Sequence, residues 1–229
     1  MHIDFYFISA VANLIANLVA LIVAALYCYR SFNPPYMRIF LLYLFGSMLV
    51  EVLANSYVGN LFGFQIYGNS QYAQNVIYNL FTLFELFMFS WFLFGIIRSS
   101  LIKRILIALV IIFTISFICY CVWVDLGKYL NTLAVVVESI IIVIPCLTYF
   151  RELFTRNRPI DLLREPSFWM VTGIIFYLAT ITPVNFAGAY LSHRGYSQVA
   201  LNLYSINNFA FVITNLLFIK GFTCRRKKS

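Results

Sequence analysis

The chain has 229 residues, of which 62% are hydrophobic and only 10% are charged. A soluble domain of this length carries about 25% charged residues, so the composition excludes a soluble globular protein and indicates that lipid surrounds most of the chain. The formal net charge of +8 does not indicate a nucleic-acid partner, because the basic residues follow the pattern of membrane topology.

Seven segments are long and apolar enough to cross a membrane as helices of about 20 residues. The first residues contain Asp4 and lack the positive stretch of a signal peptide, so we expect them to be retained at the start of the first span. Turns rich in Gly, Pro and charge separate the segments. In chain order the predicted spans are 5–29, 37–57, 74–97, 104–124, 130–150, 167–191 and 201–222. The predicted fold is one all-α domain over 1–229, a seven-helix transmembrane bundle.

The basic residues predict the direction of the spans. With the spans placed as above, fourteen of the sixteen Lys and Arg residues fall on one side of the membrane, and only Lys128 and Arg194 fall on the other. Because cytoplasmic loops carry the excess of Lys and Arg, the N-terminus is predicted outside and the C-terminus in the cytoplasm. We expect a multi-pass protein of the cell membrane, with little chain left for a soluble module.

Three glutamates lie inside predicted spans: Glu51, Glu85 and Glu138. An ionisable side chain at the centre of a span costs about 2.5–3.5 kcal/mol on insertion scales and normally faces the protein interior or water. Each glutamate lies thirteen residues from a basic residue at the cytoplasmic end of its helix, as do Asn17 and Asn207. Thirteen residues span roughly 20 Å of helix. The spacing therefore predicts a layer of carboxyl and amide groups shared by five helices.

Helical phase predicts that this layer faces inward. Asn79, Thr82 and Glu85 share one face of the third span, and Ser47 and Glu51 are four residues apart in the second. We expect these faces to line a pocket open to the outside. The candidate ligand- or ion-binding residues are Glu51, Glu85, Glu138, Asn17, Asn79, Thr82 and Asn207. The alternative for the amides and hydroxyls is structural, since such groups also tie membrane helices together.

Motifs for catalysis, metals and cofactors are not recognisable. The five cysteines are scattered through apolar segments without a CxxC pair, and the chain has only two histidines. HExxH, GxSxG and Walker-type patterns do not occur. We therefore expect no metal, no cofactor and no catalytic residue, and an intramembrane enzyme is the third of the functions considered.

Three segments carry a resemblance to a known group of proteins. ELFMFSWFLF (85–94), PSFWMVTGIIFY (166–177) and the closing INNFAFVITNLLFIKGFTCRRKK resemble segments of uncharacterised seven-helix inner-membrane proteins of bacteria. The resemblance implies a bacterial inner-membrane location and no activity.

Two functions from different classes fit these features. The first is a transporter or channel for a small solute or ion, in which the carboxyl groups carry a proton or cation. The second is a sensing module, in which a small molecule or ion binds from the outer side and the helices signal to a separate cytoplasmic partner. The lipid bilayer is the remaining expected partner.

Overall fold

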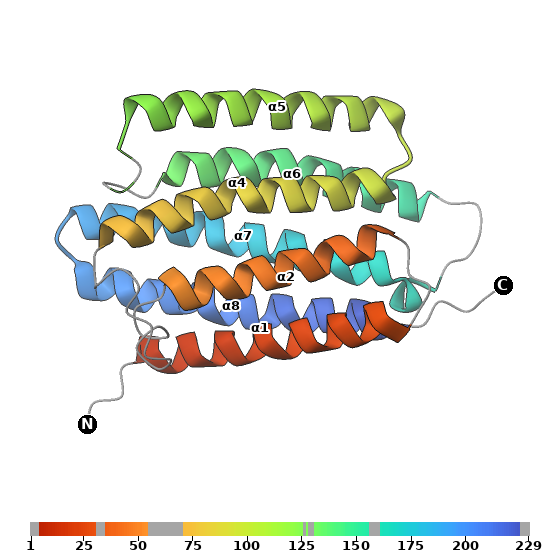
Figure 1. The fold of residues 1–229 in the computed structure, drawn as a ribbon, viewed down its shortest axis with the longest axis horizontal. Coiled ribbons are helices and arrows are strands. Elements are labelled where there is room, and N and C mark those ends of the chain that lie inside the picture. Colours follow the sequence, from red (N-terminus) through yellow and green to blue (C-terminus); the bar gives the residue numbers. More distant parts are fainter. Residues whose placement is uncertain are drawn as a thin grey trace.

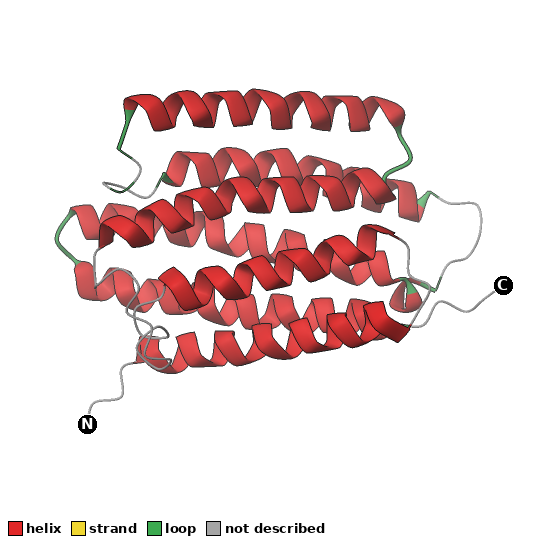
Figure 2. Cartoon of the chain, viewed as in Figure 1, coloured by secondary structure: helices red, strands yellow, loops and turns green. Residues whose placement is uncertain are grey.

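The computed structural model describes residues 5–30, 35–54, 71–125, 127, 131–155 and 161–224. Within these ranges all regular structure is helical (Figure 2). The predicted loop after the second span and the basic C-terminal tail fall outside the described residues.

The described residues form seven long helices (Figure 1). They are α1 (Phe5–Arg30), α2 (Pro35–Ala54), α4 (Gln71–Ile96), α5 (Ser100–Trp123), α6 (Thr132–Phe154), α7 (Pro166–His193) and α8 (Ser197–Thr223), and a short 3-10 helix, η1 (Leu162–Arg164), precedes α7. All seven are long and apolar enough to cross a membrane. The prediction of an all-α bundle with seven candidate spans is confirmed, and the chain has the character of a multi-pass membrane protein. The direction of insertion stays a prediction.

Local capping explains why several helices begin away from the predicted span limits. Ser99 accepts a hydrogen bond on Oγ from the Ile102 amide at 3.4 Å, so α5 begins at Ser100 rather than at 104. The side chain of Asn131 accepts from the Ala134 amide at 3.0 Å and starts α6. These polar side chains satisfy backbone N–H groups that a helix leaves free at its first turn.

The helices pack as a bundle with one peripheral member. α8 lies between α1 and α7, α2 packs on α1 and α4, and α6 packs on α4 and α7. α5 packs only along α4 and α6 and lies at the edge of the bundle (Figure 1). Its outward face exposes Leu101, Ile105, Ile107, Ile111, Ile112, Ile115, Ile118, Val122 and Trp123. A row of exposed aliphatic side chains of this kind suits contact with lipid.

One end of the bundle carries most of the described basic residues, and we call it the basic end. Arg38, Arg98, Lys103, Arg104, Arg151, Arg164 and Lys220 lie there, whereas Arg194 lies at the opposite end. At the basic end, the Leu163 carbonyl accepts hydrogen bonds from Trp169 Nε1 at 3.0 Å and from Cys224 Sγ at 3.2 Å. Burial raises the pKa of the Cys224 thiol, which keeps its proton available for this bond.

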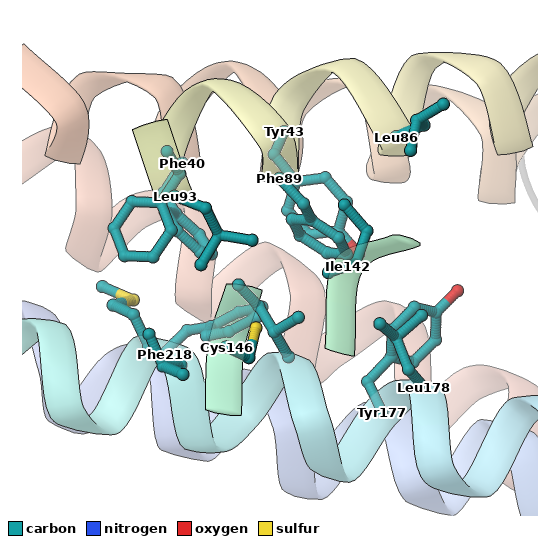
Figure 3. Packing of buried hydrophobic residues seen from close by; sticks show 14 of the residues in the cluster. Phe40, Tyr43, Leu86, Phe89, Leu93, Ile142, Cys146, Tyr177, Leu178 and Phe218 are labelled. Atoms are coloured by element: carbon teal, nitrogen blue, oxygen red, sulfur yellow. The ribbon is translucent and has the colours of Figure 1, made fainter. Parts of the chain in front are cut away.

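The bundle interior has two halves of different chemistry. The apolar half, toward the basic end, contains the largest fully buried side chains: Met37, Phe40, Leu44, Leu86, Phe89, Phe92, Leu93, Ile97, Leu106, Tyr149, Phe218 and Phe222. The polar half, toward the opposite end, contains buried amides and hydroxyls: Ser9, Asn13, Asn17, Ser47, Asn79, Thr82, Ser139, Asn185, Ser205, Asn207 and Asn208. Figure 3 shows part of the apolar half, where Phe40 and Leu93 face Phe218 and Cys146 across the interior.

Candidate functional site

Glu85 lies inside the bundle and binds two tyrosines from other helices. Its side chain is 4% exposed. Oε1 accepts a hydrogen bond from the Tyr43 hydroxyl of α2 at 2.9 Å, and Oε2 accepts one from the Tyr177 hydroxyl of α7 at 3.0 Å. Both carboxyl oxygens are therefore satisfied, which offsets part of the cost of burying the group. The contacts join three helices at a single carboxyl group.

Glu138 of α6 lies beside Glu85 because α4 and α6 run parallel in a fixed register. Asn79 Oδ1 accepts from the Asn131 amide at 2.9 Å, a separation of 52 residues. Nearer the basic end, the Glu152 carboxylate accepts from the amides of Arg98 at 2.8 Å and Ser99 at 2.9 Å, separations of 54 and 53 residues. Glu85 and Glu138 are 53 residues apart and share this register.

The two carboxyl groups form one electrostatic cluster. Glu138 is 1% exposed, and it interacts electrostatically with Glu85, Tyr43 and Tyr177. Its Oε1 atom has no hydrogen-bond partner among the described residues. The described ion pair, Arg164 with Asp161, lies at the basic end and away from this cluster. The arrangement suits a group that gains and loses a proton, because a single charge shared by two carboxyls is less costly than two.

Aromatic rings close the site on the side of the apolar half. The Tyr43 ring packs on Phe89 with a centroid distance of 4.7 Å, and the Tyr177 ring packs on Phe211 at 4.6 Å. One turn further toward the basic end, Phe40 contacts Phe92 at 4.6 Å and Phe218 at 4.8 Å. Figure 3 shows Tyr43 and Phe89 side by side, and the Tyr177 hydroxyl directed away from Phe218. The pair of carboxyls thus lies at the boundary between the two halves.

Glu51 does not lie at the level of the other two glutamates. It is eight residues beyond Tyr43 in α2, which places it about 12 Å further along the helix axis. It is half-buried and interacts electrostatically with Tyr78, seven residues before Glu85 in α4. The prediction that Glu51 shares a layer with Glu85 and Glu138 is therefore wrong.

The cause of this offset is the starting level of α2. Tyr36, in the first turn of α2, packs against Phe92 of α4 at 5.9 Å between ring centroids. Arg38 therefore lies deeper in the bundle than Arg98, which follows the last turn of α4. Thirteen residues counted from Arg38 lead to Glu51, and thirteen counted back from Arg98 lead to Glu85, so the two glutamates lie at different depths in the bundle.

The remaining candidate residues connect helices. Asn17 Nδ2 donates to Ser47 Oγ at 3.1 Å, and Asn207 Nδ2 donates to Asn185 Oδ1 at 2.9 Å. Asn79 holds the start of α6 through the Asn131 amide. Thr82 donates to the carbonyl of Tyr78 at 3.2 Å within its own helix. The structure brings Glu85 and Glu138 together, while these hydrogen bonds of the other four candidates go to different partners; the role of the four in binding stays a prediction.

Sequence reasoning missed the two tyrosines that hold Glu85. A signal for Tyr43 was present, because the stripe of Ser47 and Glu51 at steps of four continues one step back to Tyr43. Tyr177 offered no comparable signal, since it follows an apolar run and resembles a packing residue until α7 is placed against α4.

A cavity of about 170 Å³ lies away from the carboxyl pair. It is near the basic end and is lined by Tyr36, Ile39, Trp91, Phe94 and Gly95. Its lining is largely apolar, and Trp91 is 59% exposed, so the cavity opens to the face of α2 and α4 that lipid would cover. Its lining contains no carboxyl group. Among the described residues, no cluster of three or more His, Cys, Asp or Glu could hold a metal ion.

Comparison of this chain with protein-family models, with curated proteins and with solved structures finds no match.

Proposed function

We propose that the protein is a proton-coupled carrier of a small solute or ion, with Glu85 and Glu138 as its proton site. The observation that carries this proposal is the pair of buried carboxyls at the boundary between the polar and apolar halves. Intramembrane carboxyl groups are costly and are typical of proton relays in pumps and transporters.

The two carboxyls have different surroundings, and this supports different roles. Glu85 accepts from Tyr43 and Tyr177, so its position is fixed on both oxygens. Glu138 has a buried oxygen without a partner among the described residues. In this proposal Glu138 is the group that exchanges a proton, and Glu85 is the fixed neighbour whose charge makes the exchange depend on the state of the pair.

The two-part interior favours a carrier over an open channel. A channel requires a continuous polar or hydrated route, whereas the core on the side of the basic end is built from Phe40, Phe89, Phe92 and Phe218 in direct ring contact. A carrier opens such a barrier only in another conformation. The proposal therefore includes a second state in which these rings separate.

The test is a pH jump applied to protein reconstituted in liposomes on a solid-supported membrane. This recording detects charge moving when buried groups bind protons, and it does not require the substrate. We expect a transient current from the wild type and a loss of at least tenfold in Glu85→Gln and Glu138→Gln, because Gln keeps the shape but cannot titrate. Glu165→Gln, at the N-cap position before α7, is the matched control of a buried carboxyl outside the site.

The same preparation separates transport from sensing. Concentration jumps of monovalent cations, amino acids and sugars should produce a sustained current for at least one class if the protein is a carrier. A pH-jump current without any sustained current would move the protein to the sensing class. An undiminished pH-jump current in both Gln variants would contradict the proposed proton site.

A further inference from the structure

A polar stripe on α2 leads from the polar half to the carboxyl pair. Glu51, Ser47 and Tyr43 follow one another at steps of four and share a helical face. Their burial increases along the stripe: Glu51 is half-buried, Ser47 is 8% exposed and Tyr43 is 2% exposed. The stripe ends at Glu85, because the Tyr43 hydroxyl donates to Glu85 Oε1.

α1 covers this stripe with two asparagines. Asn17 Nδ2 donates to Ser47 Oγ at 3.1 Å, which sets α1 and α2 in antiparallel register at this level. Asn13 lies one turn further from the basic end in α1, and Glu51 lies one turn further in α2, so these two share the next level. The asparagines therefore accompany the stripe over its outer part.

The oxygen atoms of these asparagines require donors that the described residues do not supply. Asn13 is 3% exposed and Asn17 is 2% exposed. Asn13 Oδ1 and Asn17 Oδ1 have no hydrogen-bond partner among the described residues. Buried amide oxygens are nearly always satisfied by protein or by ordered water, so two such atoms on one face favour water molecules between α1 and α2.

We propose that the space between α1 and α2 is a hydrated access path, along which protons reach the Glu85–Glu138 pair from the end opposite the basic end. This proposal rests on the proposed function, which supplies the proton as the species that moves and the carboxyl pair as its destination. Glu51 lies at the entrance of the path, Ser47 and the two asparagines hold its water, and Tyr43 connects the water to Glu85.

The surroundings of Glu51 fit an entrance. Tyr78 of α4 faces it, and Tyr6 of α1 interacts in turn with Tyr78. Glu51, Tyr78 and Tyr6 therefore form a group of titratable side chains on α2, α4 and α1. A half-buried carboxylate of this kind collects protons from the water at the surface and passes them to a chain of waters.

The first test is thiol accessibility, which does not depend on proton chemistry. Ser47→Cys should react with a small charged methanethiosulfonate reagent in membranes, beyond the background of the parent chain. Ser90→Cys is the matched control, since Ser90 is also 8% exposed and its Oγ also has no partner among the described residues, but it lies in the apolar half of α4. We expect it to react at least tenfold more slowly. Equal rates at the two positions would overturn the path.

A third position tests the location of the path. Ser205 of α8 is buried in the polar half, and its Oγ has no partner among the described residues. Faster reaction of Ser205→Cys than of Ser47→Cys would place the water along α8 and would overturn the assignment to α2.

The second test uses the pH-jump current. Glu51→Gln and Ser47→Ala should slow its rise by at least fivefold while the total charge moved stays within twofold of the wild type. Ser90→Ala should change neither. Unchanged kinetics in Glu51→Gln and Ser47→Ala would overturn the path and leave the proton site standing. If neither Glu85→Gln nor Glu138→Gln reduces the current while Ser47→Cys still reacts, the proton site is refuted and the hydrated path is kept.

Discussion

The polar and apolar halves of this bundle use the same helices in different ways. α2 contributes Ser47 to the polar half and Phe40 to the apolar half, and α8 contributes Asn207 and Phe218 in the same manner. Each helix thus changes its inward chemistry near the level of Glu85. In the proposed function, a buried acid at such a boundary would have polar groups and water on one side and an apolar barrier on the other, as proton binding from one direction requires.

The two halves should also differ in their contributions to stability and to proton binding. We expect aromatic and aliphatic packing in the apolar half to provide most of the stability of the bundle, because the largest fully buried side chains lie there. The polar half contributes helix registration and access. Substitutions in the two halves are therefore expected to separate stability from proton binding.

The largest expected effect is a loss of stability in the apolar half. Phe89→Ala should destabilise the protein by about 3–5 kcal/mol, because it leaves a cavity beneath Tyr43. Phe87→Ala is the control in the same helix, since Phe87 is 42% exposed. Thermal unfolding in detergent measures both. Similar midpoints for the two variants would mean that the apolar half does not provide the packing energy assigned to it.

A smaller effect is expected at Glu85, and it depends on the replacement. Glu85→Leu leaves the hydroxyls of Tyr43 and Tyr177 without an acceptor, at about 1–3 kcal/mol for each buried hydroxyl. Glu85→Gln keeps an oxygen acceptor and should cost clearly less. Thermal unfolding in detergent measures this difference, and the midpoint of Glu85→Leu should be the lower of the two. If Leu were as stable as Gln, the two hydrogen bonds would contribute nothing to the fold.

Removal of one tyrosine hydroxyl should have an effect of about 1 kcal/mol. Tyr43→Phe and Tyr177→Phe each remove one donor to Glu85 and keep the ring in place. In a double-mutant cycle, each change should lose most of its destabilising effect when Glu85→Leu is already present, because Leu removes the acceptor. Tyr190→Phe, at an exposed position in α7, is the control. Additive effects in the cycle would show that the hydroxyls act independently of Glu85.

The smallest effect is expected from the amide pair in the polar half. Asn207→Ala removes the hydrogen bond to Asn185 and should cost about 0.6 kcal/mol, the average for such bonds between membrane helices. It should leave the pH-jump current unchanged, because Asn207 does not contact the carboxyl pair. Loss of that current would instead place Asn207 in the site, as the sequence predicts.

The sequence was sufficient for the helices and for part of the site. Long apolar segments and the requirement that a chain in lipid satisfy its own backbone made seven helices predictable. Glu85 and Glu138 could be placed at one level because Arg98 and Arg151, the residues from which they were counted, lie in the same 53-residue register of α4 and α6. Glu51 could not, because the depth at which α2 begins depends on the packing of Tyr36 against Phe92.

The tyrosines show a different limit of sequence reasoning. A tyrosine in an apolar segment fits both packing and hydrogen bonding, so its partner decides its role. That partner was 42 residues away for Tyr43 and 92 residues away for Tyr177. Which helices are neighbours is fixed by packing of the whole bundle, and no local pattern records it.

Radiolytic hydroxyl-radical footprinting of the protein in lipid nanodiscs tests the two-part interior most directly. Radicals form from water and modify the side chains beside it, and mass spectrometry locates the modified residues. Modification is expected at Tyr43, Tyr78 and Tyr177, where the polar half reaches the carboxyl pair, with none above background at Phe89, Phe92 and Phe218. Equal modification of both groups, or modification confined to the phenylalanines, would contradict a hydrated half that ends at Glu85 and Glu138.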